Sequence, residues 1–308
     1  MPETVGDRLV RGDKGKWLDA LGGALGGVVG GFYRIPGTRP IKDILHGTLV
    51  LRHPLHPALT DVVVGGYTVV AILDVLFLLQ RDAALLGATD VVLAVTLLVA
   101  VGSILSGYTD WNETFGNERR LGILHGAAMS LITIGYGLSL WIRVGAGPDR
   151  DPAIFLGLGL WVLVAVFAHL GGEMVFGYGT GVNRQAWTHV PGKWRRLDLR
   201  ADALEDRKPV RVEAGDGFAA MVTKVDGAIL AIGAACTHAG GPLDQGELVG
   251  PDRLDVKCPW HGSVFSLRTG AALHGPATMD EPVLETRTSA EGAVEIRARG
   301  RRSAAAAS

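Results

Sequence analysis

The two cysteines of this 308-residue chain lie close together in the sequence, and a histidine follows each of them. Cys236 is two residues before His238, and Cys258 is three residues before His261. Thiolates and neutral imidazoles both coordinate transition metals. The two segments therefore offer a four-ligand metal site, which suits either a pair of irons or a single tetrahedral zinc ion.

The order of these ligands along the chain distinguishes the two possibilities. Zinc sites usually take two cysteines from one segment and two histidines from another. Here each segment mixes one cysteine with one histidine, which favours a [2Fe–2S] centre in which two histidines replace two cysteines on one iron. A zinc site built from the same four residues is the alternative.

The residues around these ligands resemble the Rieske iron–sulfur family over about residues 192–298. Residues 236–243 and 258–265 resemble the two cluster-binding loops, and residues 275–277 resemble the proline loop that covers the cluster. The resemblance implies that the two cysteines bind one iron and the two histidines bind the other. It also places seven residues around the cluster: Gly240, Gly241, Trp260, Gly262, Ser263, Phe265 and Pro276.

Some of these positions differ from the Rieske subunits of cytochrome bc complexes. Those subunits have a disulfide between the loops where this chain has Gly241 and Trp260, and a tyrosine that hydrogen-bonds a ligand sulfur where it has Phe265. Ser263, which in those subunits donates to a bridging sulfide, is retained. Fewer hydrogen bonds to sulfur favour the oxidised cluster, so we expect a potential below the top of the range of about −150 to +300 mV. Without a disulfide, no oxidising compartment is required.

The N-terminal half of the chain is too apolar for an ordinary soluble domain. The whole chain has a mean hydropathy of +0.26 with 20% charged residues. Its net charge of −1 and its scattered basic residues give no case for nucleic-acid binding. Short polar breaks separate four segments that are each long enough to cross the roughly 30 Å hydrocarbon layer. These segments are approximately residues 58–79, 84–108, 121–144 and 153–171.

The C-terminal half changes to short apolar runs of period two, broken by Asp-Gly and Gly-Pro pairs, which predict antiparallel strands. We therefore expect an all-α four-transmembrane-helix bundle followed by an all-β Rieske domain, an antiparallel β-sandwich. The expected parts are a glycine-rich interfacial segment (1–43), the transmembrane domain (44–183), a linker (184–191), the Rieske domain (192–298) and a disordered tail (299–308).

Four crossings place both termini on one side of the membrane. Basic residues are more numerous in the loops on that side, so the positive-inside rule predicts a cytoplasmic Rieske domain on a multi-pass protein of the bacterial inner membrane. Residues 18–33 carry glycines at GxxxG spacing but are short for a span, and we expect them to pack on a helix or lie at the interface. If they cross the membrane, the sidedness changes.

The start of the first apolar helix resembles a family of small bacterial four-helix membrane proteins with an H-P-x-H-P pattern and no settled function. The resemblance covers roughly residues 44–183. Ionisable residues in membrane segments are costly and often functional. Those expected near the Rieske side are His53, His56, Asp61, Asp110, His125 and His169. They suggest a bis-histidine haem b, a quinone pocket or another metal; the alternative is a structural role at helix ends and at the interface.

These features predict a membrane-anchored protein that shuttles single electrons between a cytoplasmic partner and a membrane or oxidoreductase partner. Membrane lipid and a reductase or oxygenase are the expected partners. A Rieske oxygenase subunit would need a second iron site with two histidines and a carboxylate, and only a short tail follows residue 298, so we do not expect that activity. The alternative function is a redox sensor whose cluster controls the membrane domain.

Overall fold

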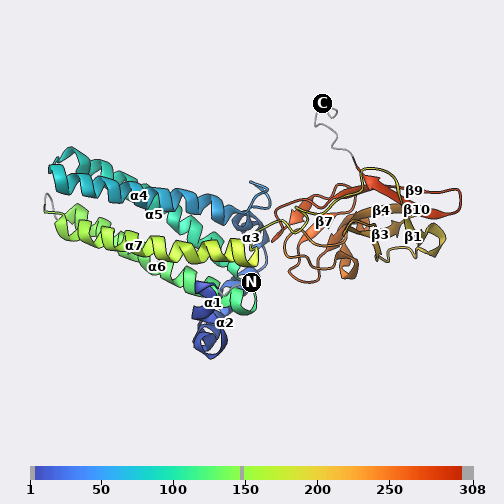
Figure 1. Ribbon diagram of the computed structural model, residues 1–308, viewed down its shortest axis with the longest axis horizontal. Helices are drawn as coiled ribbons and strands as arrows, with labels where there is room; N and C mark the ends of the chain where they lie inside the picture. The colour runs from blue at the N-terminus through green and yellow to red at the C-terminus, as the bar shows by residue number, and fades with distance from the viewer. Residues whose placement is uncertain (1–3, 146–148, 300–308) are drawn as a thin grey trace. The chain divides into compact units, whose positions relative to one another are not determined.

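The computed structural model describes residues 4–145 and 149–299, and the chain divides into two compact units (Figure 1). The first unit contains the chain up to His46 together with Pro54–Thr180. The second contains Gly47–His53 together with the chain from Gly181 onward. The tail expected at residues 299–308 lies outside the described residues, apart from Arg299.

Four long helices form the body of the first unit: α4 (Leu55–Gln80), α5 (Ala84–Trp111), α6 (Gly116–Gly145) and α7 (Asp151–Glu173), which continues into the π-helical turn η2 (Met174–Tyr178). All four are long and apolar enough to cross a membrane. Pro57 lies in the first turn of α4 and Pro152 in the first turn of α7, where a missing backbone N–H costs nothing. The four expected spans are thus present as helices.

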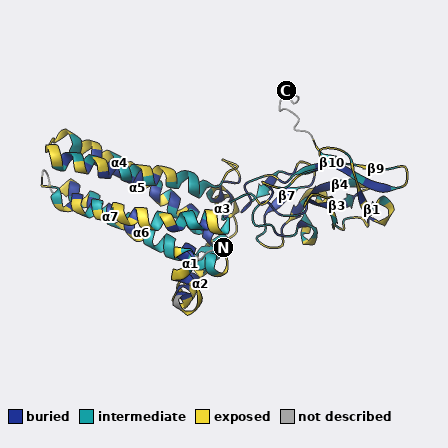
Figure 2. Ribbon diagram, viewed as in Figure 1, coloured by how far each residue is buried: buried dark blue, intermediate teal, exposed yellow. Residues whose placement is uncertain are grey.

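Most of the apolar surface of these helices faces outward. Between 22 and 33% of each apolar window is buried inside the bundle. Leu79, Leu98 and Ile134 are each more than two-thirds exposed, and Figure 2 shows exposed positions along α4 to α7. Such surface is unfavourable in water but matches the hydrocarbon of a bilayer. The unit is therefore a helical membrane domain.

The interior of the bundle holds one fully buried ion pair. The Arg143 guanidinium donates to both carboxylate oxygens of Asp74, at 2.8 and 2.6 Å, and to Ser139 Oγ at 3.2 Å. The two charged side chains are 1% and 2% exposed. Because each charge offsets the desolvation of the other, the pair ties α4 to α6 within the apolar core.

Helices α1 (Val5–Val10), η1 (Gly12–Gly15), α2 (Lys16–Tyr33) and α3 (Arg39–His46) precede the bundle, and none of them is among the four candidate spans. One glycine stripe of α2 receives Arg119 of α6, whose guanidinium donates to the Gly22 carbonyl at 3.2 Å and stacks 4.2 Å from the Trp111 ring. A Cβ at Gly26 would lie 2.2 Å from Arg119 Nη2. The GxxxG-spaced glycines therefore allow α2 to pack closely on the bundle.

The second unit is built from antiparallel strands in two sheets, of order β1-β10-β9-β4-β3-β2 and β5-β6-β7-β8. The strands are β1 (Arg195–Arg200), β2 (Val210–Glu213), β3 (Ala219–Val225), β4 (Ala228–Gly233), β5 (Glu247–Val249), β6 (Asp255–Lys257), β7 (Val264–Ser266), β8 (Ala272–His274), β9 (Val283–Thr288) and β10 (Ala293–Ala298). A tight turn joins β3 to β4, where Asp226 and Gly227 both have positive φ.

Two apolar cores flank the larger sheet, because successive side chains of a strand point to opposite faces. In β3, Met221 belongs to the core that also contains Val256 and Phe265 of the smaller sheet. Its neighbour Val222 belongs to a second core with Phe218 and Ile296. Cys236 and Cys258 are part of the first core, so the packing between the two sheets positions both ligand loops.

We expect removal of one charge from the Asp74–Arg143 pair to destabilise the bundle strongly. Asp74→Ala leaves an uncompensated buried guanidinium, and such a change costs about 3–5 kcal/mol. Thermal unfolding of the detergent-solubilised protein measures the loss. The matched control is Arg81→Ala, because the Arg81–Asp151 pair also joins two helices but is exposed to solvent. Equal effects of the two substitutions would contradict a stabilising role for the buried pair.

Candidate metal centre

The two ligand loops have the same hydrogen-bond pattern. In the first loop, the Cys236 N–H donates to Gly241 O and the Gly240 N–H donates back to Cys236 O, both at 2.8 Å. In the second, the Cys258 N–H donates to Ser263 O at 2.8 Å, and the Gly262 N–H donates to Cys258 O at 3.1 Å. Each cysteine thus begins a tight turn that closes five residues later.

A glycine with positive φ closes each turn. Gly240 has φ +82° and Gly262 has φ +76°, conformations that side chains with a Cβ rarely adopt. Between the cysteine and this glycine, the turn projects the ligand histidine: His238 in the first loop and His261 in the second. The mixed order of ligands in the sequence is therefore a consequence of two similar turns facing one another.

The structure places the four predicted ligands in two pairs, one of thiols and one of imidazoles. The Cys236 and Cys258 thiols are close enough to hydrogen-bond to each other. The imidazoles of His238 and His261 have ring centroids 4.9 Å apart, with the rings nearly perpendicular. The cysteines are 1% and 2% exposed, whereas both histidines are half-buried. One thiol pair lies inside the domain and one imidazole pair lies toward its surface.

This pairing fits a binuclear iron–sulfur cluster better than a single metal ion. Across residues 4–145 and 149–299, no three His, Cys, Asp or Glu side chains converge on one point suited to a metal ion. A tetrahedral zinc site would need four ligands at a single point. A Rieske cluster takes two cysteines at one iron and two histidines at the other.

The two thiols have different roles in the hydrogen bond between them: Cys236 donates and Cys258 accepts. The pKa of Cys258 is lowered to about 6, because its sulfur accepts hydrogen bonds from Cys236 and from the backbone N–H groups of Trp260 and His261. The pKa of Cys236 is raised, because it donates that hydrogen bond and is buried. The loops thus favour a thiolate at Cys258, which is the form that binds metal.

Three of the residues expected around the cluster are buried in the second unit. Ser263 is fully buried, and its Oγ accepts the Ala277 N–H at 2.9 Å, which leaves its own hydroxyl hydrogen available to donate. Phe265 is fully buried in the core beside the cysteines, and Pro276 is buried in the third loop. Phe265 and Ala277 belong to the same buried core as both cysteines, and the Ser263 hydrogen bond ties the second ligand loop to the third loop.

The neighbours of Gly241 leave no room for a side chain at this position. A Cβ at this position would lie 2.8 Å from Cys258 Sγ and 3.1 Å from the ring of Trp260. A larger residue at position 241 would therefore displace a ligand. Trp260 itself is 56% exposed and lies beside His261, with ring centroids 6.3 Å apart.

A buried acidic side chain, which no sequence pattern indicated, supports the first ligand loop. Glu281 is 3% exposed, and its Oε1 accepts the Thr237 N–H at 2.6 Å, between the two ligands of that loop. Burial raises the pKa of Glu281, and the hydrogen bonds from Thr237 and Gln185 oppose that shift. In sequence, Glu281 follows Asp280 in a polar stretch that reads as ordinary surface.

The segment expected to be a linker also holds this loop. The Arg184 N–H donates to Thr237 O at 3.0 Å, and Gln185 Nε2 donates to Ala235 O at 2.6 Å. Residues 47–53, which we assigned to the membrane domain, contact the third loop instead: Thr48 Oγ1 donates to Ala277 O at 3.0 Å, and Arg52 pairs with Asp280. Segments from both ends of the bundle sequence therefore belong to the cluster-binding unit.

The ionisable residues of the membrane domain do not all gather in one place. His56 and His125 lie together, with ring centroids 6.4 Å apart. The His169 side chain is 65% exposed and contacts Glu173 at 3.2 Å. Asp61 is exposed, and His53 belongs to the second unit. Asp110 accepts a hydrogen bond from buried His46 at 2.7 Å, a partner that the sequence analysis missed.

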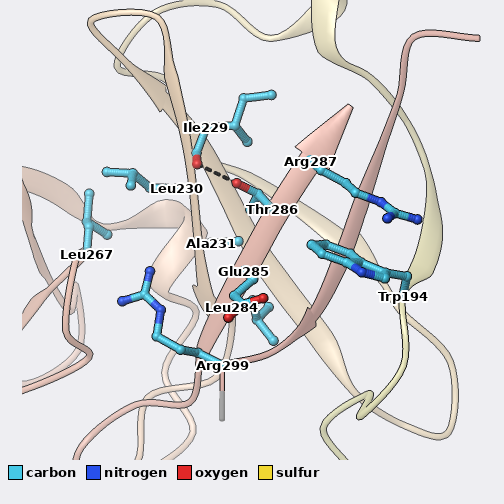
Figure 3. Close-up of a pocket in the computed structure, with 10 residues that line it drawn as sticks. All are labelled: Trp194, Ile229, Leu230, Ala231, Leu267, Leu284, Glu285, Thr286, Arg287 and Arg299. Atoms are coloured by element: carbon cyan, nitrogen blue, oxygen red, sulfur yellow. Dashed lines mark hydrogen bonds between the residues drawn. The ribbon is translucent and has the colours of Figure 1, made fainter. Parts of the chain in front are cut away.

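A shallow groove of about 390 Å³ lies on the larger sheet (Figure 3). Its lining includes Trp194, whose ring contacts the Arg287 guanidinium at 4.2 Å and that of Arg297 at 4.6 Å. None of the four cluster ligands lines this groove. It is therefore separate from the metal chemistry.

Comparison with known proteins defines both units. Residues 194–286 match the Rieske [2Fe–2S] domain family, and residues 52–184 match a family described as a predicted membrane protein (DUF2231). Sulredoxin of Sulfurisphaera tokodaii is 35% identical over 86 residues, which cover 27% of this chain and 72% of that protein. The cluster-binding unit thus has the sequence of an iron–sulfur electron-transfer protein.

Two further relatives match shorter stretches. Apoptosis-inducing factor 3 of mouse and human is 42% identical over 67 residues, which are 22% of this chain and span 10% of the length of those proteins. The 3-phenylpropionate/cinnamic acid dioxygenase ferredoxin subunit of Photorhabdus laumondii is 42% identical over 53 residues, covering 17% of this chain and 49% of that protein. The chain belongs to the Rieske [2Fe–2S] family. In this chain the Rieske domain is joined to a helical membrane domain.

We expect anaerobically purified protein to contain two irons per chain and to give a Rieske-type EPR signal when reduced. His261→Cys should move that signal toward that of an all-cysteine cluster or abolish the cluster, because it changes a ligand of the histidine-bound iron. His274→Cys is the matched control, since His274 lies in the same unit outside the two loops. Stoichiometric zinc without iron in the wild-type protein would exclude the cluster.

Phe265→Tyr should raise the reduction potential of the cluster. A tyrosine hydroxyl at this buried position would supply a donor near the ligand sulfurs and would stabilise the more negative reduced state. One such hydrogen bond of roughly 1 kcal/mol corresponds to about 40 mV for a one-electron couple. Redox titration followed by EPR measures the shift. An unchanged or lower potential would show that the ring does not approach the sulfurs.

Proposed function

We propose that this protein is a membrane-anchored Rieske electron carrier, which passes single electrons between a cytoplasmic partner and a membrane or oxidoreductase partner. The observation that carries the proposal is the arrangement of the ligand pairs. The thiols are buried, whereas both imidazoles are half-buried. The histidine-bound iron is thereby the one closer to a docking partner.

The surface beside the imidazoles is suited to a partner protein. Trp260 is an exposed aromatic residue directly next to His261 in the chain. Exposed tryptophans are enriched at the energetically important positions of protein interfaces. The similarity to a dioxygenase ferredoxin subunit supports an oxygenase or reductase as that partner.

The location follows from the sequence arguments. We place the protein in the bacterial inner membrane with the Rieske domain in the cytoplasm, because basic residues are more numerous in the loops on the side of the termini. The chain has no cysteines besides the two ligands and so has no disulfide to form in an oxidising compartment. Protease treatment of spheroplasts tests this topology. A cytoplasmic Rieske domain is protected until the cells are lysed, and cleavage before lysis would place the domain on the opposite side of the membrane.

Trp260→Ala should slow electron transfer out of the cluster without changing the cluster itself. Mitochondrial cytochrome c serves as a one-electron acceptor, and stopped-flow absorbance follows reoxidation of the reduced protein. We expect a several-fold lower second-order rate constant with an unchanged EPR signal, because the substitution removes contact area at the imidazole surface. Trp194→Ala, in the groove of Figure 3, is the control and should leave the rate unchanged. Equal rates for wild type and Trp260→Ala would refute docking at this surface.

A redox sensor is the second candidate, and one observation favours it. Arg184 and Gln185, in the segment that follows the last membrane helix, bond directly to the loop that carries two of the ligands. A change in that loop on reduction would act on this segment. Hydrogen exchange of residues 181–188 in the oxidised and reduced protein distinguishes the two functions. A sensor requires protection to differ between the states, whereas a carrier does not.

A further inference from the structure

His56 and His125 face each other across the interior of the membrane domain. His56 lies in the first turn of α4 and His125 lies in α6, two helices that are not consecutive in the chain. Their ring centroids are 6.4 Å apart, and the two ring planes are 81° from parallel. Among the described residues, histidines such as His46 and His169 contact a carboxylate, and neither His56 nor His125 does so. Neither histidine is one of the predicted cluster ligands, which lie in the other unit.

Hydrogen bonds fix the tautomer of both imidazoles. His56 Nδ1 bonds the carbonyl of Ser103 in α5 at 2.9 Å, and His125 Nδ1 bonds the carbonyl of Phe167 in α7 at 2.8 Å. A carbonyl only accepts, so each Nδ1 carries a hydrogen, and in the neutral imidazole the lone pair is then on Nε2. No described residue hydrogen-bonds to either Nε2. Metal-ligating histidines are usually held in this way, through the other ring nitrogen.

Glycines on the neighbouring helices make room for both rings. A Cβ at Gly107 of α5 would lie 2.7 Å from His56 Cε1, and a Cβ at Gly171 of α7 would lie 3.0 Å from His125 Cε1. Each imidazole is therefore seated against a glycine of the same helix that accepts its hydrogen bond. This arrangement fixes the orientation of both rings before any ligand binds.

The segments of α4 and α6 that carry these imidazoles are only partly buried. Farther along the same helices, fully buried residues recur, such as Val63 and Tyr67 in α4 and Ile132 and Tyr136 in α6. By contrast, all residues at 54–60 and 124–130 retain partial exposure, and none is buried. A helix packed against a solid core buries its inner face at every turn. Neither α4 nor α6 therefore buries a complete inner face at this level, although Ser103 and Ser106 of α5 and Leu170 of α7 are buried there.

We propose that His56 and His125 are the two axial ligands of a metalloporphyrin of the haem b type. A metal–imidazole bond is about 2 Å long and the ring centre lies about 1 Å behind the nitrogen, so trans imidazoles place their ring centres about 6 Å apart. No third His, Cys, Asp or Glu side chain joins the pair among the described residues. A macrocycle supplies its own four equatorial nitrogens, whereas a bare zinc ion would lack ligands. The only cysteines lie in the other unit, so the macrocycle is held without thioether bonds.

The test uses the full-length protein purified from membranes, stripped of any bound haem and titrated with hemin. We expect one hemin per chain, a Soret band, and the spectrum of a low-spin bis-imidazole complex. His56→Ala and His125→Ala should each weaken hemin binding by a factor on the order of 10 to 100 or more. His169→Ala is the matched control and should bind as the wild type does, since that histidine is exposed.

A conservative variant separates ligation from folding. His125→Met should still bind hemin but with a changed spectrum and a raised midpoint potential, because histidine–methionine ligation raises the haem potential. Far-UV circular dichroism and thermal unfolding of the detergent-solubilised protein report independently that the membrane domain of each variant is folded, because the Rieske EPR signal reports only on the other unit. The proposal is overturned if folded wild-type protein does not bind hemin stoichiometrically, or if both alanine variants bind it with wild-type affinity and spectrum. These outcomes do not depend on the proposed electron-carrier function, which the cytochrome c experiment tests separately.

Discussion

The cluster-binding unit depends on two short turns that each project a cysteine and a histidine in the same direction. Hydrogen bonds from Gly240 and Gly262 back to the cysteine carbonyls close these turns, and only a residue without a Cβ adopts the required positive φ without strain. Facing the turns toward one another brings thiol to thiol and imidazole to imidazole. The two irons of a Rieske cluster need this separation of ligand types, because the iron bound by cysteine and the iron bound by histidine differ in charge and in exposure.

The sheets hold the two turns at a fixed separation. The core that contains Met221, Ile232 and Val256 also contains both ligand cysteines, so the loops move only if the sandwich is disturbed. The cysteines that would hold one iron are buried away from water, and the histidines that would hold the other are partly exposed. The fold thereby shields the cluster while it leaves one side accessible to a partner. Glu281 and Gln185 complete this support from outside the sheets.

Much of this could be predicted from the sequence, because it is encoded locally. Spacing gave the four ligands, glycines gave the turns, period-two alternation gave the strands, and long apolar runs gave the four helices. What could not be predicted depends on contacts between distant segments. Gln185 lies in a stretch that reads as a linker, and no pattern indicates that it reaches Ala235. Depth in the membrane grouped His169 with His56 and His125, but depth does not fix the direction of a side chain, and His169 points outward.

The two ends of the membrane bundle treat polar groups differently. At one end, Asp74 and Arg143 neutralise each other in the buried interior, where the guanidinium donates to both carboxylate oxygens. At the other end, His56 and His125 are bonded through a single nitrogen each, to backbone carbonyls. A neutral imidazole costs far less to bury than an ion, so one hydrogen bond suffices to hold it. The second nitrogen of each ring then has no hydrogen-bond partner among the described residues, unlike the charged groups of the Asp74–Arg143 pair.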